Sequence, residues 1–581
     1  MRIPRNFSPS IVQVSAFGSI PSHGLRVLAS LACLAVFGGT IRAGESPPPG
    51  ASVSGDVKVG ARGSVGAGAE AAMVRGPYLQ MGTPASIVVR WRTDLASDSR
   101  VLYGPAPDDL SFSVILPALT TEHIVTVTHL DPDTRYYYAV GTSSTLLVGA
   151  DSDHFFVTAP NVGMATPTRI WILGDSGTAD GNARAVRDAY YSFTGNHHTD
   201  LWLMLGDNAY SSGTESQYQS AVFNTYPEML RKSVLWPTLG NHDAASADSG
   251  TQSGVYYDIF SLPRAGEAGG LASGTEAYYS FDHGNIHFIV LDSHDSDRAA
   301  NGPMATWMEQ DLATTAQDWI IAYWHHPPYS KGSHDSDSES RLIDMRTNFL
   351  PILEDYGVDL VFSGHSHSYE RSFLIDGHYD ASATFDESMK LDGGDGQEGG
   401  DGMYQKPAAG GAPHAGAVYT VAGSSGKTSG GSLNHPAMYT SLNVPGSVVL
   451  DVAEKRLDAT FLDDEGVVRD RHTIIKGNGC SDDRDSDGAC DSSDNCLDVA
   501  NLDQSDFDGD GVGDACENGV TVADIDISGR VDGYDLVRLA RSFGTQCGDA
   551  DYRSEVDLDR NCDIDGDDLS LLAAYFGESS N

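Results

Sequence analysis

Five short apolar runs between residues 168 and 371 are each followed directly by a cluster of polar residues, and this pattern constrains the chain most. Stretches of helical periodicity lie between several of the runs, which predicts an α/β core in which the runs are strands. The clusters are Gly174-Asp175, Gly206-Asp207-Asn208-Ala209-Tyr210, Gly240-Asn241-His242-Asp243, His325-His326 and Gly364-His365-Ser366-His367. Ligands of α/β sheets bind at the carboxyl ends of strands, so we expect the clusters to converge on one crevice.

The pooled side chains of these clusters suit hard or borderline cations. They offer two carboxylates, a phenol, an amide oxygen and three imidazoles, with no cysteine to favour a soft ion. The candidate ligands are Asp175, Asp207, Tyr210, Asn241, His325, His365 and His367. One such cluster alone is usually an ordinary turn, but five in this order favour a metal centre. The set suffices for two ions that share one carboxylate, and such a pair can bind a phosphoryl group and activate water.

The order of the clusters resembles that of calcineurin-like metallophosphoesterases. Tyr210 and the ending His365-Ser-His367-Ser-Tyr-Glu-Arg371 are similar to those of purple acid phosphatases. The segment from Arg75 to Val157 opens with Arg-Gly-Pro-Tyr-Leu-Gln, alternates as short strands and resembles that family's fibronectin-like N-terminal domain. The implied fold is multidomain: a fibronectin type III-like β-sandwich over residues 74–160, then a four-layer αββα metallophosphoesterase sandwich over residues 167–476.

The resemblance also implies a role for each candidate. A first metal, Fe(III) in the family, would bind Asp175, Asp207, Tyr210 and His367. A second, divalent metal (Fe, Zn or Mn) would bind the bridging Asp207 with Asn241, His325 and His365. A metal-bound hydroxide would attack phosphorus in line, without a covalent phosphoenzyme. His242 would contact the phosphoryl group, and His334 would assist the leaving group as an acid.

Four further residues bear on this assignment. Asp335 stands where plant relatives often carry a second histidine, which weakens the case for protonation of a poor leaving group. His326 either supports the metal ligands or serves in packing. Glu370 and Arg371 are expected to form an ion pair that supports the His365–His367 loop.

The N-terminus carries the pattern of a secretory signal. Arg2, Arg5 and Arg26 precede the apolar run 27–38, and small residues follow near Ala43. This predicts a signal peptide over residues 1–43 and a secreted or extracellular protein. The alternative is a retained membrane anchor, but the run is shorter than the roughly 20 residues that span a bilayer. Residues 44–73, rich in Pro, Gly, Ala and Ser, read as a linker. We expect no transmembrane span after cleavage.

The negative net charge of the chain argues against nucleic acid as a partner and favours cations. The chain has 81 acidic against 36 basic residues, a net charge of −45. Such a surface repels phosphate backbones, so the protein is not expected to coat nucleic acid. Residues 480–581 contain 27 of the acidic residues, only 6 of the basic ones and six of the seven cysteines. This cysteine-rich acidic tail suggests disulfides and bound cations.

The tail repeats carboxylates at every second residue before a glycine, a spacing that wraps oxygens around Ca²⁺. Residues 480–518 resemble thrombospondin type 3 repeats, for which we expect disulfides Cys496–Cys516 and Cys480–Cys490. Residues 519–578 resemble a dockerin module with two duplicated loops, each leading into an apolar helix. In the second loop Cys562 replaces the glycine and could pair with Cys547. The expected calcium ligands are Asp483, Asp485, Asp487, Asp506, Asp508, Asp510, Asp524, Asp526, Ser528, Asp532, Asp535, Asp557, Asp559, Asn561, Asp565 and Asp568. The alternative is a merely solubilising acidic tail.

Together these patterns predict a secreted acid phosphatase-type metallophosphoesterase that hydrolyses phosphate monoesters. Its tail would bind Ca²⁺ and dock to a cohesin-like or cell-surface partner. One rival is a phosphodiesterase or nucleotide-pyrophosphate hydrolase, because the same metal pair serves both reactions. Another is a Ca²⁺-dependent surface or adhesion protein with a vestigial phosphatase domain, although all seven ligand positions are filled.

Overall fold

A computed structural model describes the two large folded regions of the chain and parts of its tail. The described residues are 70–407, 411–477, 494–497, 499, 513, 516, 523, 525, 530–531, 533–546, 552–553, 556, 558 and 563–576. The predicted signal peptide and residues 44–69 of the predicted linker lie outside them. Within the described ranges, no helix combines the length and apolar composition needed to span a bilayer.

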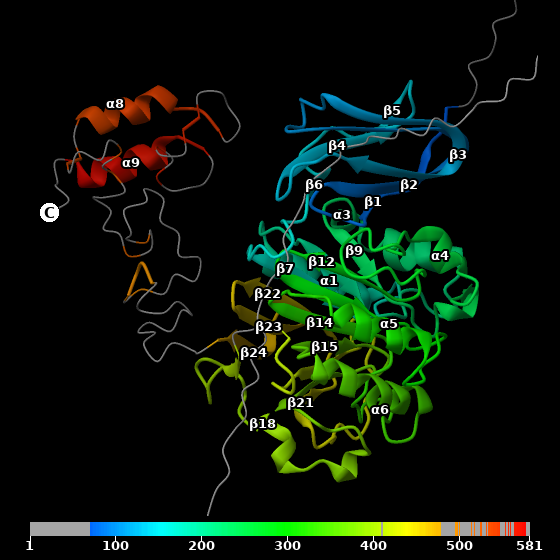
Figure 1. The fold of residues 1–581 in the computed structure, drawn as a ribbon. Helices are drawn as coiled ribbons and strands as arrows, with labels where there is room; N and C mark the ends of the chain where they lie inside the picture. The colour runs from blue at the N-terminus through cyan, green and yellow to red at the C-terminus, as the bar shows by residue number, and fades with distance from the viewer. Residues whose placement is uncertain are drawn as a thin grey trace, which may run out of the picture. The chain divides into compact units, whose positions relative to one another are not determined.

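The N-terminal region is an all-β domain (Figure 1). Its strands are β1 (Met73–Gln80), β2 (Ser86–Gly104), β3 (Phe112–Thr128), β4 (Arg135–Gly141), β5 (Leu146–Gly149) and β6 (Phe155–Val157). Strand β2 pairs antiparallel with β1, β3 and β4, and Trp91, Val125 and Tyr138 are buried in the core. The period-2 apolar pattern predicted such strands, because alternate residues of a strand face the same side.

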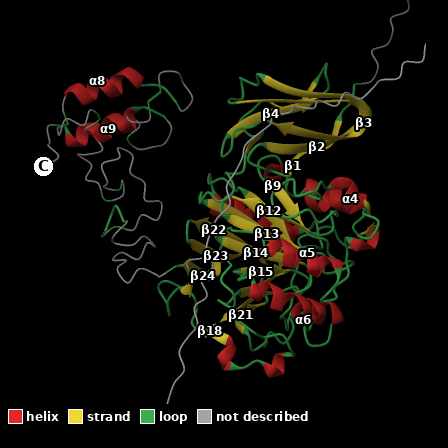
Figure 2. Cartoon of the chain, in the orientation of Figure 1, coloured by secondary structure: helices red, strands yellow, loops and turns green. Residues whose placement is uncertain are grey.

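Two sheets form the larger domain (Figure 2). The first runs β19 (Tyr404–Lys406), β24 (Val468–Lys476), β23 (Arg456–Asp463), β22 (Gly446–Ala453), β7 (Thr168–Leu173), β8 (Leu201–Met204) and β9 (Val234–Pro237), and continues through β1 into the N-terminal domain. The second runs β12 (Tyr279–His283), β13 (Ile286–Val290), β14 (Trp319–Trp324), β15 (Leu360–Ser363), β20 (Val418–Ala422), β16 (Tyr369–Ser372) and β21 (Met438–Leu442).

Aromatic side chains hold the layers together. Between the sheets, Trp236 stacks on Phe281 with ring centres 3.9 Å apart. On the first sheet, Trp171 stacks on Tyr190 of α1 (Gly181–Thr194) at 4.3 Å. Helices α5 (Pro303–Leu312) and α6 (Ser340–Asp355) pack on the second sheet in a separate apolar core. The resulting order is helix, sheet, sheet, helix, which is the α/β fold of metallophosphoesterases.

One predicted helix is broken. The sequence pattern predicts a single helix over residues 217–230, whereas the structure has α2 (Glu215–Tyr218), a π-helical turn (Gln219–Phe223) and α3 (Pro227–Leu230). Proline lacks the N–H that a helix interior needs, so Pro227 begins a new helix instead of continuing the old one. A further short helix, α4 (Val255–Ile259), follows along the chain.

The expected ion pair between Glu370 and Arg371 is wrong. Consecutive residues of strand β16 point to opposite faces of the sheet, so their side chains cannot meet. Arg371 instead binds Asp470 of β24 through Nε and Nη2, at 2.6 and 2.9 Å. Glu370 accepts hydrogen bonds from the Ser330 hydroxyl at 2.6 Å and the Lys331 amide at 3.1 Å. Glu370 also accepts from the hydroxyl of Ser368, directly after His367, at 3.0 Å and so supports the His365–His367 loop, whereas Arg371 joins strand β16 to β24.

The described part of the tail contains α8 (Gly533–Ser542), α9 (Gly566–Tyr575) and a small apolar core. The predicted disulfide Cys496–Cys516 is confirmed, with an S–S distance of 2.04 Å. Asp535 and Asp568 are fully buried, and Asp565 is partly buried. The other expected calcium ligands and the expected pairs Cys480–Cys490 and Cys547–Cys562 lie outside the described residues.

Candidate metal centre

The five strand-end clusters converge at one edge of the two sheets. Strands β7, β8 and β9 of the first sheet lead to Asp175, Asp207 and Asn241, and strands β14 and β15 of the second lead to His325 and His365. Asp175, Asp207 and His325 each place a ligand atom within 4.8 Å of the others. The clusters therefore meet where parallel strands of both sheets end, as expected from the sequence.

Two groups of contacts connect six of the seven candidate ligands. In the first group, the Tyr210 hydroxyl donates to Asp175 Oδ1 at 2.8 Å, and His367 Nε2 lies 3.4 Å from the same oxygen. In the second, His325 Nε2 lies 3.0 Å from Asn241 Oδ1 and 3.2 Å from His365 Nδ1.

Asp207 lies between the two groups. Its Oδ1 is 3.4 Å from His325 Nε2 and accepts the backbone N–H of His242 at 2.8 Å. Asp207 is only 1% exposed, so it offers its carboxylate to the centre and not to bulk water.

Contacts with a backbone carbonyl and with a hydroxyl group determine which ring nitrogen of His325 and of His367 faces the centre. His325 Nδ1 lies 2.9 Å from the carbonyl oxygen of Leu205, which can only accept, so Nδ1 carries the proton and Nε2 keeps its lone pair for a cation. His367 Nδ1 contacts the Ser429 hydroxyl at 2.8 Å, again leaving Nε2 toward the centre. Such outer contacts orient metal-binding histidines and raise their basicity.

Glycines make the close approach of these loops possible. Gly206 has φ +90°, and a Cβ at this position would lie 2.6 Å from His325 Nδ1. A Cβ at Gly240 would lie 2.0 Å from the amide nitrogen of Asp207. Asp175, Asp207 and His365 themselves have φ values of +56°, +52° and +64°, a left-handed conformation that costs free energy for residues other than glycine. Strain at three candidate ligands indicates a site shaped for function.

The electrostatics of the first group favour a strongly charged cation. Burial alone would raise the pKa of Asp175, but the hydrogen bond from His367, the charges of His325 and His367 and the bond from Tyr210 hold it below its usual range. Burial and the negative charges of Asp175 and Asp207 raise the pKa of Tyr210 far above its ordinary value. Without a cation the phenol keeps its proton, whereas a bound metal ion reverses this balance.

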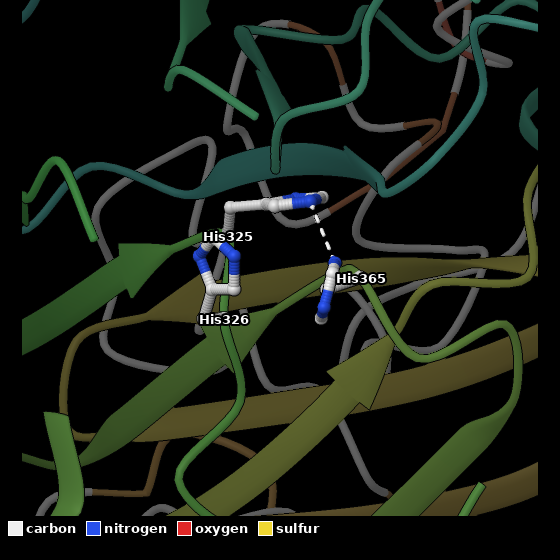
Figure 3. A group of neighbouring side chains, drawn as sticks. All are labelled: His325, His326 and His365. Carbon is white, nitrogen blue, oxygen red and sulfur yellow. Dashed lines mark hydrogen bonds between the residues drawn. The ribbon is translucent and has the colours of Figure 1, made fainter. Parts of the chain in front are cut away.

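His326 lies against both histidines of the second group (Figure 3). Its ring centre is 4.4 Å from that of His365 and 4.9 Å from that of His325, and its Nδ1 contacts the Ser293 hydroxyl at 2.9 Å. Burial and the neighbouring charges of His325 and His365 lower its pKa well below the usual range. In Figure 3, His325 and His365 point toward one another. His326 thus both packs against the candidate ligands and holds a fixed orientation.

His334, the expected acid, is held at the edge of the site by a residue that sequence reasoning missed. Glu339 accepts from His334 Nδ1 at 2.9 Å, and its other oxygen lies 3.5 Å from His365 Nε2. The His334 ring also stacks on His365 at 3.7 Å. The hydrogen bond to His365 and the charge of His334 lower the pKa of Glu339 to about 2. Asp335 turns to Lys331, at 2.5 Å.

Asp243 is a second support to which the sequence assigned no role. It is fully buried and accepts hydrogen bonds from the amides of Asn208 and Gly240 and from the Tyr218 hydroxyl. Burial and the charge of Asp207 raise its pKa to about 7. The signal for it was present in the sequence, because Asp243 directly follows Asn241-His242 in the third cluster.

Both domains match family models of known phosphoesterases. Residues 168–369 match the family model of calcineurin-like phosphoesterases, and residues 74–158 match that of the purple acid phosphatase N-terminal domain. The chain is 30% identical to purple acid phosphatase 15 of Arabidopsis thaliana over 43% of this chain and 49% of the relative. It is 31% identical to purple acid phosphatase 1 of Ipomoea batatas over 43% and 51%.

The chain thus spans about half the length of the curated relatives it matches. Its fold is similar to that of a purple acid phosphatase from yellow lupin (Lupinus luteus) seeds, with a TM-score of 0.54, 18% identity and coverage of 70% of this chain and 75% of that one. These matches support an acid phosphatase-type hydrolase, and the family that they indicate implies a binuclear metal centre.

Proposed function

We propose that the chain, which carries both matched domains of purple acid phosphatases, is a secreted binuclear metal-dependent phosphatase that hydrolyses phosphate monoesters. The observation that carries this proposal is the connected set of seven ligand side chains at the strand ends. Carboxylate, phenol, amide and imidazole together suit iron, zinc or manganese. When bound, two such cations lower the pKa of a shared water and neutralise phosphoryl oxygens.

The two contact groups support a division of ligands between the cations. The first group, Asp175, Tyr210 and His367, with Asp207 would hold Fe(III), since a phenolate suits a trivalent ion. The second group, Asn241, His325 and His365, with the shared Asp207 would hold a divalent Fe, Zn or Mn. Asp207 lies within ligand distance of members of both groups, which supports its bridging role.

Two histidines outside the ligand set complete the proposed chemistry. His242 Nδ1 lies 2.6 Å from the carbonyl oxygen of Ser211, and Nε2, which lies 3.8 Å from Asp207 Oδ2, would contact a phosphoryl oxygen. His242 is partly exposed, as a residue that meets substrate must be. His334, fixed by Glu339, would give its proton to the leaving oxygen. Position 335 is an aspartate that pairs with Lys331, so His334 would act without the second histidine that plant relatives often carry there.

The tail would bind Ca²⁺ and dock the enzyme to a cohesin-like or cell-surface partner. The disulfide Cys496–Cys516 supports an oxidising compartment, in agreement with the proposed signal peptide. Helices α8 and α9 and the buried carboxylates of Asp535 and Asp568 support a compact module of duplicated loops.

Initial rates on para-nitrophenyl phosphate and on its diester test the proposed reaction. We expect the full chain to hydrolyse the monoester faster, and His325→Ala to reduce that rate by about a thousandfold, because the second cation loses an imidazole ligand. His197→Ala, at an exposed histidine away from the centre, is the control and should retain the rate. A faster rate on the diester would favour the phosphodiesterase alternative, and full activity of His325→Ala would contradict the proposal.

A further inference from the structure

Lys427, in the loop after strand β20, places a cation beside the candidate centre. Its Nζ lies 4.1 Å from the centre of the Tyr210 ring. Among the described residues, Lys427 takes part in no ion pair or hydrogen bond, although acidic residues outnumber basic ones by more than two to one. Lys331, close to the same site, is by contrast bound to Asp335 and Asp337. A contact with a ring face still leaves N–H donors of the ammonium group that point away from the ring available for an anion.

Both flanks of Lys427 are anchored to backbone next to candidate ligands. On one side, the Ser425 amide donates to the carbonyl oxygen of Gly174 at 3.1 Å. A Cβ at Gly426 would lie 2.5 Å from the carbonyl oxygen of Asp175, so the chain passes in close contact there. On the other side, the Ser429 amide donates to the carbonyl oxygen of His367 at 3.1 Å. These contacts hold the main chain on both sides of Lys427. The Tyr210 ring, and no acidic side chain among the described residues, lies next to its ammonium group.

The Lys427 ammonium group lies beside groups that are already proposed to bind the transferred phosphoryl group. The Tyr210 ring contacts His242 as well, with ring centres 4.6 Å apart, and His242 is the residue proposed to contact a phosphoryl oxygen. The proposed metal ions neutralise the remaining phosphoryl charge. Lys427 thus adds a positive charge that a substrate with a single phosphate group does not need. The net charge of −45 on the chain repels substrates that carry further negative charges, and a local cation would offset this repulsion.

We infer that Lys427 binds a second anionic group of the substrate and so selects phosphate monoesters that carry a carboxylate or another phosphate near the ester. The inference rests on the proposed function and narrows its substrate class. A charge-assisted hydrogen bond in a partly buried site contributes enough free energy to shift a specificity constant by about tenfold.

A matched pair of substrates tests this role. Glycerol phosphate and phosphoglycerate differ in that a hydroxymethyl group of the first is a carboxylate in the second. The quantity measured is the ratio of kcat/KM for phosphoglycerate to kcat/KM for glycerol phosphate. We expect the full chain to prefer phosphoglycerate, Lys427→Met to lower the ratio by about tenfold and Lys427→Arg to retain most of it. Lys232→Met, which removes a lysine paired with Asp153, is the control and should leave the ratio unchanged.

The outcomes separate this inference from the function on which it rests. Hydrolysis of both substrates with an unchanged ratio in Lys427→Met would overturn the role of Lys427 and leave the phosphatase assignment standing. An equal fall of the ratio in Lys232→Met would also overturn it, because the effect would then come from overall charge. Failure of the unmodified chain to hydrolyse either ester would overturn the proposed function and this inference together.

Discussion

Asp207→Asn is expected to reduce kcat/KM for a phosphate monoester by at least about a thousandfold. The substitution keeps the shape of the side chain and an oxygen for the His242 amide, which donates to Asp207 Oδ1 at 2.8 Å. It removes the negative charge that both proposed cations share and one of the two oxygens that would bridge them, so the affinity for both ions falls. Elemental analysis of the purified variant should therefore find fewer than two metal ions per chain.

Asp248→Ala is the matched control for this experiment. Asp248 is exposed, and its Oδ1 accepts hydrogen bonds from the amide and hydroxyl of Thr251. We expect this variant to keep both its metal content and its rate. A fully active Asp207→Asn that binds two ions would show that Asp207 does not bridge them.

Gly206→Ala should lower activity by a different route, through the geometry of the second contact group. The new methyl group would lie 2.6 Å from His325 Nδ1 and 2.9 Å from Gly240, in a crowded interior. The backbone must also keep φ +90°, which an alanine adopts only at a cost of about 1–2 kcal/mol. Relief of the contact displaces His325 from Asn241 and His365. We expect a fall in both the thermal midpoint and the rate.

Gly274→Ala distinguishes backbone strain from displacement of the imidazole. Gly274 has a comparable φ of +77°, but a Cβ there would meet no atom within 4 Å. This control should show a modest loss of thermal stability and ordinary phosphatase activity. If Gly206→Ala behaved in the same way, the close packing around His325 would have no role in the site.

Most of the candidate centre could be predicted because its signals are local. A glycine that allows a sharp exit from a strand, followed by a metal-binding side chain, is visible in a few residues, as at Gly206-Asp207 or Gly364-His365. The parallel arrangement of the strands then brings the clusters together without further information. The disulfide Cys496–Cys516 was predictable for a similar reason, since it lies within one short repeat.

The residues that support the centre could not be predicted in the same way, because their roles depend on contacts between loops that are far apart in the sequence. Glu339 is one of several acidic residues in a polar segment, and only the fold shows that it binds His334 and approaches His365. Lys427 is far from Tyr210 along the chain, and its proposed role follows only from the contact between its ammonium group and the Tyr210 ring. The expected Glu370–Arg371 pair conflicts with strand geometry, but only the structure shows that both residues lie in strand β16.

Anomalous diffraction from crystals of the full chain, recorded at the absorption edges of iron, zinc and manganese, tests the central claim most directly. We predict two ions about 3.5–4 Å apart, with Asp207 in contact with both, Tyr210 on one and Asn241 on the other. A single ion, or two ions of which Asp207 contacts only one, would contradict the binuclear centre from which the proposed reaction follows.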